Sequence, residues 1–217
     1  MEDMKCDMAG AAAVLSVFKI ITRLKPKVEV HGIIAATYNM PGPDAYKPGD
    51  VLKAMNGKTI EVWNTDAEGR LILADALCLA AQQQPQAIVD LATLTGAVVI
   101  ALGSKVAGLM GNDAKLAGQI KAAGKRADEH FCELPLVEDY KENIKGNIAE
   151  LLNISKARGE AGSIIGGLFL QEFVDAKPWV HLDIAGTAFT SSDSATYAPK
   201  GATGSPVRTL LEWLAGL

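Results

Sequence analysis

The sequence has few cysteines and aromatic residues and no strong excess of charge of either sign. Its three cysteines, Cys6, Cys78 and Cys132, are far apart and form no C-x-x-C pair, which argues against a disulfide framework and a thiolate zinc site. We therefore expect a reducing, cytoplasmic compartment. Aromatic residues make up 6% of the chain, and the formal net charge is −4. This balance gives no electrostatic basis for nucleic-acid binding, which needs a basic face.

Signal peptides and long apolar runs are also missing. The first residues, MEDMKCDM, are acidic where a signal peptide needs a basic region. The longest apolar runs, GAAAVLSVF and GAVVIALG, are too short to cross a bilayer, so we expect no membrane association. Hydrophobic residues make up 49% of the 217 residues, which is enough to bury the core of one domain.

Apolar patterns divide the chain into alternating helices and strands. This alternation predicts one α/β domain, or most of one, over residues 1–217: three layers, with a central mixed, mostly parallel sheet flanked by helices on both faces. The predicted helices are 4–24, expected to be buried on most sides, 69–83, 113–130, 159–176 and 206–217, the last with Ser205 as N-cap. The predicted strands are 27–39, 86–94 and 179–186, with a hairpin at 51–62 turning at Asn56-Gly57, and a short helix followed by a strand within 96–112.

Two carboxylates, Asp66 and Glu68, precede an apolar run in NTDAEGRLILADAL. Thr65-x-x-Glu68 fits a helix capping box. In an extended loop, however, Asp66, Glu68 and Arg70 would point to the same side. Converging carboxylates repel unless they share a proton or a cation, and oxygen clusters suit hard or borderline divalent metals. The residues alone leave both interpretations open, and both can hold at once.

Asp7 is a third carboxylate, near the start of the first predicted helix. Its ordinary interpretation is an acid in a first helical turn, and the alternative is a third ligand for the same cation. Arg70 would be a fixed donor to an anion or to a carbonyl oxygen.

Other motifs are less specific. NGKT resembles the end of a phosphate loop, but the required earlier glycine falls at Leu52, so we expect a turn. ATLTGA and GTAF each follow a strand and are either polar connections or backbone facing a ligand crevice. His31 and His181 lie in strand patterns and are expected to be core histidines. No Ser/His/Asp or Cys/His arrangement is visible.

NTDAEGRLILADAL resembles the signature of the cytosolic leucyl aminopeptidases, the di-metal leucine aminopeptidase family. MEDMKCDMAGAAAVL resembles the helix of that family that bears a metal-binding aspartate. YKPGDVLKAMNGKTIEV, VDLATLTGA, AGLMGND, WVHLDIAGTAF and YAPKGATGSPVRTL have family counterparts in the same order. The resemblance covers nearly the whole chain. It implies a C-terminal catalytic domain that removes an apolar first residue, preferably leucine, from peptides with a free N-terminus.

The resemblance also implies roles for individual residues. Asp7, Asp66 and Glu68 would bind two divalent ions, Mn²⁺ or Zn²⁺ with Mg²⁺ or Co²⁺ as alternatives, and Glu68 would bridge them. Arg70 would hold a bicarbonate-like anion that acts as general base in a two-metal hydrolysis. The whole protein would be a homo-hexamer. The substrate would contact Met4, Thr93, Leu94, Gly96, Ala185 and Ala188.

One part of the family pattern is absent. The family's catalytic domain begins with a strand-and-loop segment of the type G-K-G-x-x-x-D-x-G-G followed by a lysine. That segment supplies two lysines and a bridging aspartate, and the chain starts after it. Lys5 is no substitute, because it aligns with a basic position beside Asp7. We therefore expect a domain incomplete at its N-terminal end, with weak metal binding, little or no activity alone, and exposed apolar surface.

Two other functions remain as alternatives. A non-catalytic assembly or binding module with the same fold would explain the missing lysines. Retention of Asp7, Asp66, Glu68 and Arg70 argues against it, because unpaired acids are costly to bury. A Mg²⁺-dependent phosphoryl-transfer enzyme could use the acids, but the sequence has no phosphate loop. A metal-dependent aminopeptidase is the preferred hypothesis.

Overall fold

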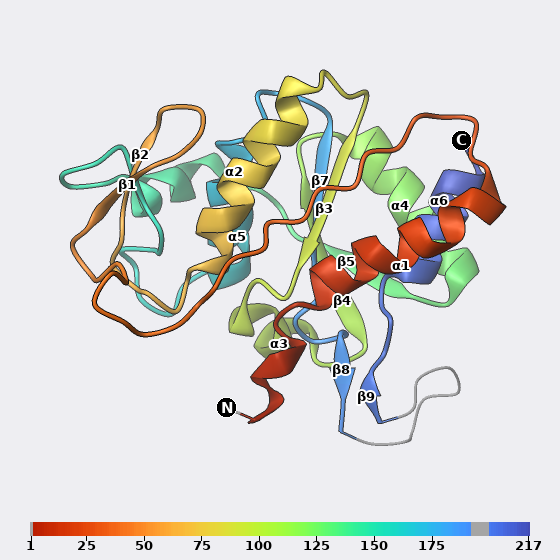
Figure 1. Cartoon of the computed structure of the whole chain (residues 1–217), viewed down its shortest axis with the longest axis horizontal. Coiled ribbons are helices and arrows are strands. Elements are labelled where there is room, and N and C mark those ends of the chain that lie inside the picture. Colours follow the sequence, from red (N-terminus) through yellow and green to blue (C-terminus); the bar gives the residue numbers. More distant parts are fainter. Residues whose placement is uncertain (1, 192–199) are drawn as a thin grey trace.

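A four-stranded sheet lies in the middle of the molecule (Figure 1). The computed structural model describes residues 2–191 and 200–217. The strand order is β3 (Ile88–Ala92), β7 (Trp179–Asp183), β4 (Val106–Gly111) and β5 (His130–Glu133). The β3–β7 and β4–β5 pairs are parallel, and the β4–β7 pair is antiparallel. The expected mixed, mostly parallel sheet is therefore confirmed.

Helices cover both faces of this sheet. Successive strand residues point to opposite sides, so each face presents apolar side chains that a helix layer buries. Ile88 and Trp179 pack in one apolar cluster with α2 (Gly69–Gln82) and α5 (Gly162–Gln171). Leu91 and Val180 pack in a second cluster on the other face. This second cluster is completed by α1 (Ala9–Leu24), α4 (Ala114–Ala127) and α6 (Val207–Ala215), while α3 (Gly96–Leu102) follows β3. The three expected layers are present.

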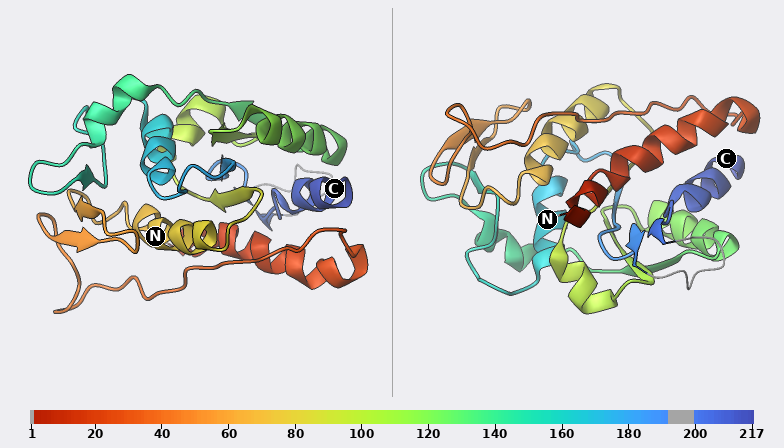
Figure 2. Two further views of the ribbon diagram at one scale, coloured as in Figure 1. Left: turned by 90° about the horizontal axis from the view of Figure 1, so that it is seen from above. Right: turned by 60° about the horizontal axis from the view of Figure 1, so that its bottom comes forward.

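A small sheet extends the molecule at one end, opposite the end formed by α1, α4 and α6 (Figure 2). The expected hairpin forms between β1 (Val51–Lys53) and β2 (Thr59–Glu61), with Gly57 at φ +92° in its turn. β2 also pairs in parallel with β6 (Leu151–Leu152), which the sequence did not predict. The remaining elements are the 3₁₀ helices η1 (Glu2–Cys6) and η2 (Glu138–Ile144) and the strands β8 (Phe189–Thr190) and β9 (Gly201–Ala202).

The first helix differs from the prediction. Residues 4–24 divide into η1 and α1, and only Gly10, Ala13 and Val17 of α1 are buried. Leu15 is 61% exposed, so the expected burial on most sides was wrong. The helix packs on the sheet along one narrow face, and at Gly10 it comes so close to β3 that a Cβ would collide with the Leu91 carbonyl oxygen.

The predicted strand at 27–39 is wrong. These residues form no strand, and no backbone hydrogen bond joins residues 26–41 to another described residue. Val28 and Val30 are half-buried, while Glu29 and His31 are exposed and hydrogen-bonded to each other at 2.8 Å. His31 is therefore not a core histidine. The stretch has the alternation of a strand, but no strand of the described chain is hydrogen-bonded to it.

Helix ends also depart from expectation. The last helix begins at Val207 rather than Pro206, and its N-cap is Pro206 with no side-chain cap bond. Ser205 does not cap it, and its hydroxyl group instead lies 3.3 Å from the Thr187 hydroxyl group.

The three cysteines are free, as expected. Residues 197–199 of the motif YAPKGATGSPVRTL lie outside the described residues.

Across the described ranges 2–191 and 200–217, no helix combines the length and apolar character that a bilayer span needs.

Candidate active site

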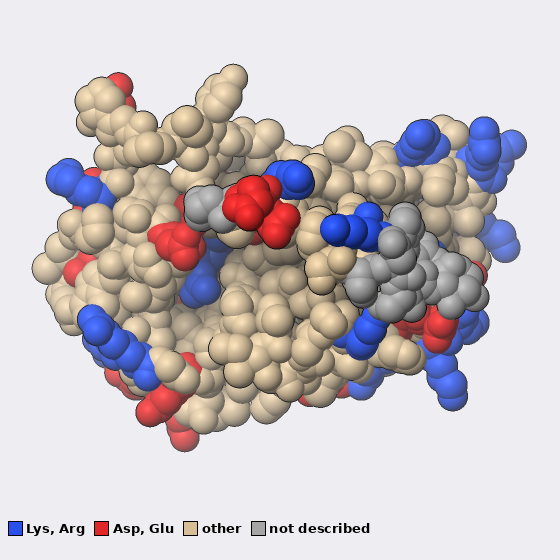
Figure 3. Space-filling model, turned by 90° about the horizontal axis from the view of Figure 1, so that it is seen from below, with Lys and Arg blue, Asp and Glu red and all other residues tan. Residues whose placement is uncertain are grey.

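One cleft gathers most of the residues that the sequence singled out. It has a volume of about 1470 Å³ and lies between α1, α2, β3 and the stretch 27–37. Figure 3 shows a hollow on this side of the molecule, with acidic side chains at its rim and basic atoms deeper inside. Ala185 and Ala188 do not line the cleft, and Ala188 is buried. The predicted site residues that do line it are Met4, Asp7, Asp66, Glu68, Arg70, Thr93, Leu94 and Gly96.

The loop before α2 brings Asp66 and Glu68 to the cleft. The Asp66 N–H donates to the Asn64 side-chain oxygen at 3.0 Å, which turns the chain just before the helix. α2 begins at Gly69, and Glu68 occupies the N-cap position. No side chain makes a capping hydrogen bond to the first turn. The Thr65–Glu68 capping box is therefore not formed, and the helix cap does not occupy the Glu68 carboxylate.

Asn153 holds this loop in place through side-chain hydrogen bonds to its backbone, and the sequence analysis did not predict this role. Its buried side chain accepts from the Trp63 N–H at 2.8 Å and donates to the Asn64 carbonyl oxygen at 2.6 Å. The adjacent Trp63 indole N–H donates to the Glu61 carboxylate at 2.6 Å. The only signal in the sequence was one amide within the run LLNIS, directly after β6.

Arg70 is the buried cation of the cleft. Its side chain donates to the Asn153 carbonyl oxygen at 2.9 Å, and its guanidinium carbon lies 6.0 Å from the centre of the Phe169 ring. Burial lowers the pKa of Arg70 to about 10, against the opposing effect of Asp183 and Glu68. Arg70 therefore stays charged at neutral pH. Since guanidinium has five N–H donors, those not bonded to Asn153 remain for an anion.

Asp7 is tied to the loop after β3. The Thr93 hydroxyl donates to the Asp7 carboxylate at 2.6 Å. This bond links the segment between η1 and α1 to the carboxyl end of the sheet, so Asp7 and Thr93 face the same part of the cleft. Met4, one turn earlier, is half-exposed at the cleft wall.

Asp183, at the end of β7, fixes the loop Thr93–Gly96. Its fully buried carboxylate accepts from the Leu94 N–H at 3.1 Å and from the Thr95 hydroxyl at 2.6 Å. It also accepts from the Ala185 N–H at 3.3 Å. Sequence reasoning missed Asp183, although a charge inside the apolar strand WVHLDIAG was the available signal.

The three candidate metal ligands share the cleft without completing a metal site. In the described part of the chain, no three side chains of His, Cys, Asp or Glu come close enough together to hold an ion. The oxygen donors of Asp7, Asp66 and Glu68 have the right chemistry for divalent metals. Closed sites for such ions use four or more ligands, so further donors are needed.

Comparison with known proteins identifies the family. The profile of the cytosol aminopeptidase family, catalytic domain, matches residues 1–211. The chain belongs to this family. A probable cytosol aminopeptidase of Persephonella marina is 55% identical over 99% of this chain, and one of Thermosynechococcus vestitus is 54% identical over all of it. Among solved structures, a mutant of tomato leucine aminopeptidase is 46% identical and superposes with a TM-score of 0.93 over the whole chain. The family resemblance and the fold class seen in the sequence are thus confirmed.

The chain spans less than half of each of these relatives. It covers 43% of the Persephonella and Thermosynechococcus proteins and 42% of the tomato enzyme. More than half of each relative's polypeptide therefore has no counterpart in these 217 residues.

Proposed function

We propose that this chain is part of the catalytic domain of a metal-dependent aminopeptidase, incomplete at its N-terminal end. The substrate would be a peptide with a free N-terminus and an apolar first residue, preferably leucine. One observation carries the proposal: in a member of the cytosol aminopeptidase family, Asp7, Asp66, Glu68 and Arg70 line a single cleft.

Asp7, Asp66 and Glu68 are the proposed ligands of two divalent ions, Mn²⁺ or Zn²⁺, with Mg²⁺ or Co²⁺ as alternatives. When bound, two such ions supply an activated water and polarise the scissile carbonyl group. The half-exposed Glu68 carboxylate makes no capping hydrogen bond to α2, which supports its role as the bridging ligand.

Arg70 is the proposed anchor of a bicarbonate-like anion that acts as general base. Its burial beside Phe169 supports this role, because a guanidinium group in a water-poor site binds an anion more strongly than an exposed one. Asn153 orients the guanidinium group, so the anion would sit at a fixed position beside Glu68.

The loop after β3 is the proposed binding site for the first substrate residue. Leu94 and Gly96 would offer backbone groups, and Met4 and Thr93 would form part of the pocket wall. Ala185 does not line the cleft itself and is proposed at the edge of this pocket. Support comes from Asp183, whose carboxylate binds the N–H groups of both Leu94 and Ala185.

We further propose a cytoplasmic location and a homo-hexameric whole protein. The names of the relatives, which are cytosol aminopeptidases, support the location. The resemblance to the family is the support for the hexamer.

Activity would depend on groups outside these 217 residues, because the described residues bring too few ligands together. The test is hydrolysis of leucine p-nitroanilide with Mn²⁺ or Zn²⁺. The 217-residue chain alone is compared with the same chain joined to the segment that precedes the matched region in the Persephonella relative. We expect hydrolysis only by the joined protein.

Glu68→Gln in the joined protein should lower the rate at least about 100-fold, since loss of a carboxylate ligand removes metal as well as charge. Glu142→Gln, at an exposed position in η2, is the matched control and should keep the rate. Hydrolysis by the isolated chain that Glu68→Gln abolishes would contradict the dependence on outside groups. A joined protein that binds metal but does not hydrolyse the substrate would contradict the proposed aminopeptidase activity.

A non-catalytic assembly module with this fold is the second candidate. The incomplete ligand set within the described residues favours it. The joined protein distinguishes the two candidates, because an assembly module would form the oligomer without hydrolysing the substrate.

A further inference from the structure

His181, in the middle of β7, has one ring nitrogen bonded and the other without a partner. Its Nδ1 lies 2.6 Å from the Asp90 carboxylate of β3. Because an ionised carboxylate only accepts hydrogen bonds, Nδ1 carries the proton of this bond. Nε2 is buried and has no polar partner in the described ranges 2–191 and 200–217. Buried polar atoms in native proteins are almost always hydrogen-bonded, so Nε2 calls for a partner.

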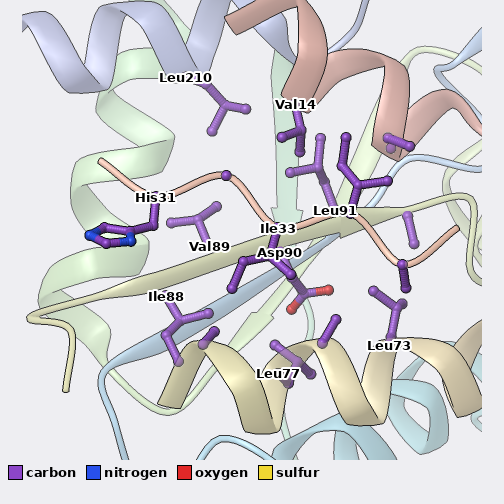
Figure 4. A pocket seen from close by; sticks show the side chains of 18 of the residues that line it. Val14, His31, Ile33, Leu73, Leu77, Ile88, Val89, Asp90, Leu91 and Leu210 are labelled. Carbon is purple, nitrogen blue, oxygen red and sulfur yellow. The ribbon is translucent and has the colours of Figure 1, made fainter. Parts of the chain in front are cut away.

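His181 and Asp183 project from the same face of the sheet. Residues two apart on a strand point to one side, and Trp179 of the same strand packs in the cluster with α2 and α5. Both side chains therefore enter the layer of α2 and α5, with Cα atoms about 7 Å apart. Asp90 approaches His181 from β3, and Figure 4 shows its carboxylate on the side of β3 that faces α2.

The Asp183 carboxylate can accept one more hydrogen bond. One of its oxygens accepts from the backbone N–H groups of Leu94, Thr95 and Ala185. Among the described residues, the other oxygen accepts from the Thr95 hydroxyl group alone, at 2.6 Å. A carboxylate oxygen has two lone pairs, so this second oxygen keeps one acceptor position.

Arg70 of α2 acts on both of these side chains. Burial lowers the pKa of Arg70 to about 10, and the charge of Asp183 opposes this effect. Burial also acts to lower the pKa of His181; Asp90 and Asp183 together raise it, and Arg70 opposes them. The guanidinium group is thus a further donor in the same layer. A buried water makes about two to four hydrogen bonds, and these groups offer both donors and an acceptor for one.

We propose that His181 is a positioning residue of the candidate active site and that it acts through one internal water bound between its Nε2 and the second Asp183 oxygen. A water can accept from a charged imidazole ring or donate to a neutral one, so it fits Nε2 in either state. The chain of bonds then runs from Asp90 through His181 and the water to Asp183, whose other oxygen holds the loop Thr93–Gly96.

The ordinary alternative is that His181 only ties β7 to β3 through Asp90. In that case the loop after β3 would not respond to the loss of Nε2. The inference rests on the proposed function only in taking this loop as the binding site of the first substrate residue. The water and the loop can be observed without any activity.

Two substitutions separate the two ring nitrogens. In His181→Asn, the short amide takes the place of Nδ1 and keeps a bond to Asp90, but no group remains at Nε2. In His181→Gln, the longer amide reaches the position of Nε2 and presents an N–H donor to the water. A role in loop positioning follows the Gln variant, whereas a role in sheet pairing alone follows the Asn variant.

Amide hydrogen exchange of the 217-residue chain measures the loop. Leu94 and Ala185 donate to Asp183, and Ile120 of α4, on the other face of the sheet, is the internal reference. Relative to Ile120, we expect His181→Asn to speed exchange of both amides at least about 10-fold and His181→Gln to change it by less than about threefold. Equal effects of the two variants, or a larger effect of His181→Gln, would overturn the proposal.

A crystal structure of the unsubstituted chain tests the water without any variant. We expect one ordered water within about 3.2 Å of both His181 Nε2 and the Asp183 carboxylate. An Nε2 without such a water would overturn the proposal.

The protein joined to the preceding segment of the Persephonella relative tests the link to substrate. His181→Asn should raise KM for leucine p-nitroanilide at least about fivefold with kcat within about twofold, and His181→Gln should keep both values. A fall in kcat at unchanged KM would overturn this link. If the unsubstituted joined protein is inactive, the proposed function fails, and the exchange rates and the water decide this inference by themselves.

Discussion

At the scale of single residues, two buried polar side chains shape the candidate site. Asn153 fixes the loop that carries Asp66, and Asp183 fixes the loop that carries Leu94. The sequence pointed to the residues that would contact ligands, because their motif is specific. It did not point to these two supports, because one polar residue within an apolar run does not reveal which distant loop it binds.

Replacing Asn153 with Ala should lower the free energy of unfolding by about 2–3 kcal/mol, because the loop amides and carbonyls it binds would be left unpaired. Urea denaturation measures the change. Asn147→Ala is the matched control: its side chain is exposed, and only its backbone N–H is bonded, to Glu61, so the change should stay within about 0.5 kcal/mol. Equal losses in both variants would contradict the role of Asn153.

At the scale of elements, the sequence correctly predicted the helices and strands whose signal lies within their own residues. α2, α4, β3 and β7 have strong apolar patterns, and the hairpin has an Asn-Gly turn. Residues 27–39 failed for the opposite reason. Their pattern is that of a strand, but a strand also needs a neighbour for its backbone. β6 was missed because two residues are too short for any period.

The β3–β7 pair contains a buried ion pair that makes stability depend on pH. His181 lies 2.6 Å from Asp90, whose other carboxylate oxygen accepts from the Trp179 indole. Burial alone would lower the pKa of His181, but Asp90 and Asp183 together raise it above its ordinary value of 6.5. The pair therefore contributes its full stability below about pH 6.5 and loses it as pH rises through the raised pKa of His181.

Asp90→Asn should reverse this pH dependence, because without Asp90 the burial of His181 outweighs the attraction of Asp183 and lowers the pKa of His181. It should also destabilise the protein at pH 5 by about 3–5 kcal/mol, because a buried charge loses its partner. Urea denaturation at pH 5, 7 and 9 measures both effects. Asp44→Asn, at an exposed loop position, is the control and should keep the wild-type slope. An unchanged slope in Asp90→Asn would contradict the assignment.

At the scale of the whole molecule, the apolar cleft is the main departure from a closed domain. Leu73 and Leu77 of α2 face a cavity of about 1470 Å³ where a closed three-layer domain would have a buried core. The sequence predicted exposed apolar surface through the family resemblance. It could not place that surface, because its location follows from which sheet edge remains open.

The isolated chain should therefore bind 1-anilinonaphthalene-8-sulfonate, a dye that fluoresces on apolar surface. Leu73→Ser should reduce the emission at least about twofold, because Leu73 lines the cleft. Leu79→Ser, in the same helix but on its exposed side, should not. Joining the preceding segment of the relative should also reduce the emission. A signal that responds equally to both substitutions would place the apolar surface elsewhere.

The bond between Trp63 and Glu61 gives the candidate metal loop an optical label of its own. The Trp63 indole, one residue before Asn64, is partly exposed to solvent and donates to the Glu61 carboxylate. Trp179, in contrast, is fully buried. Any displacement of the loop changes the polarity around the Trp63 ring. Its fluorescence therefore reports loop movement on addition of Mn²⁺ or Zn²⁺ without a dye, a tag or a substrate.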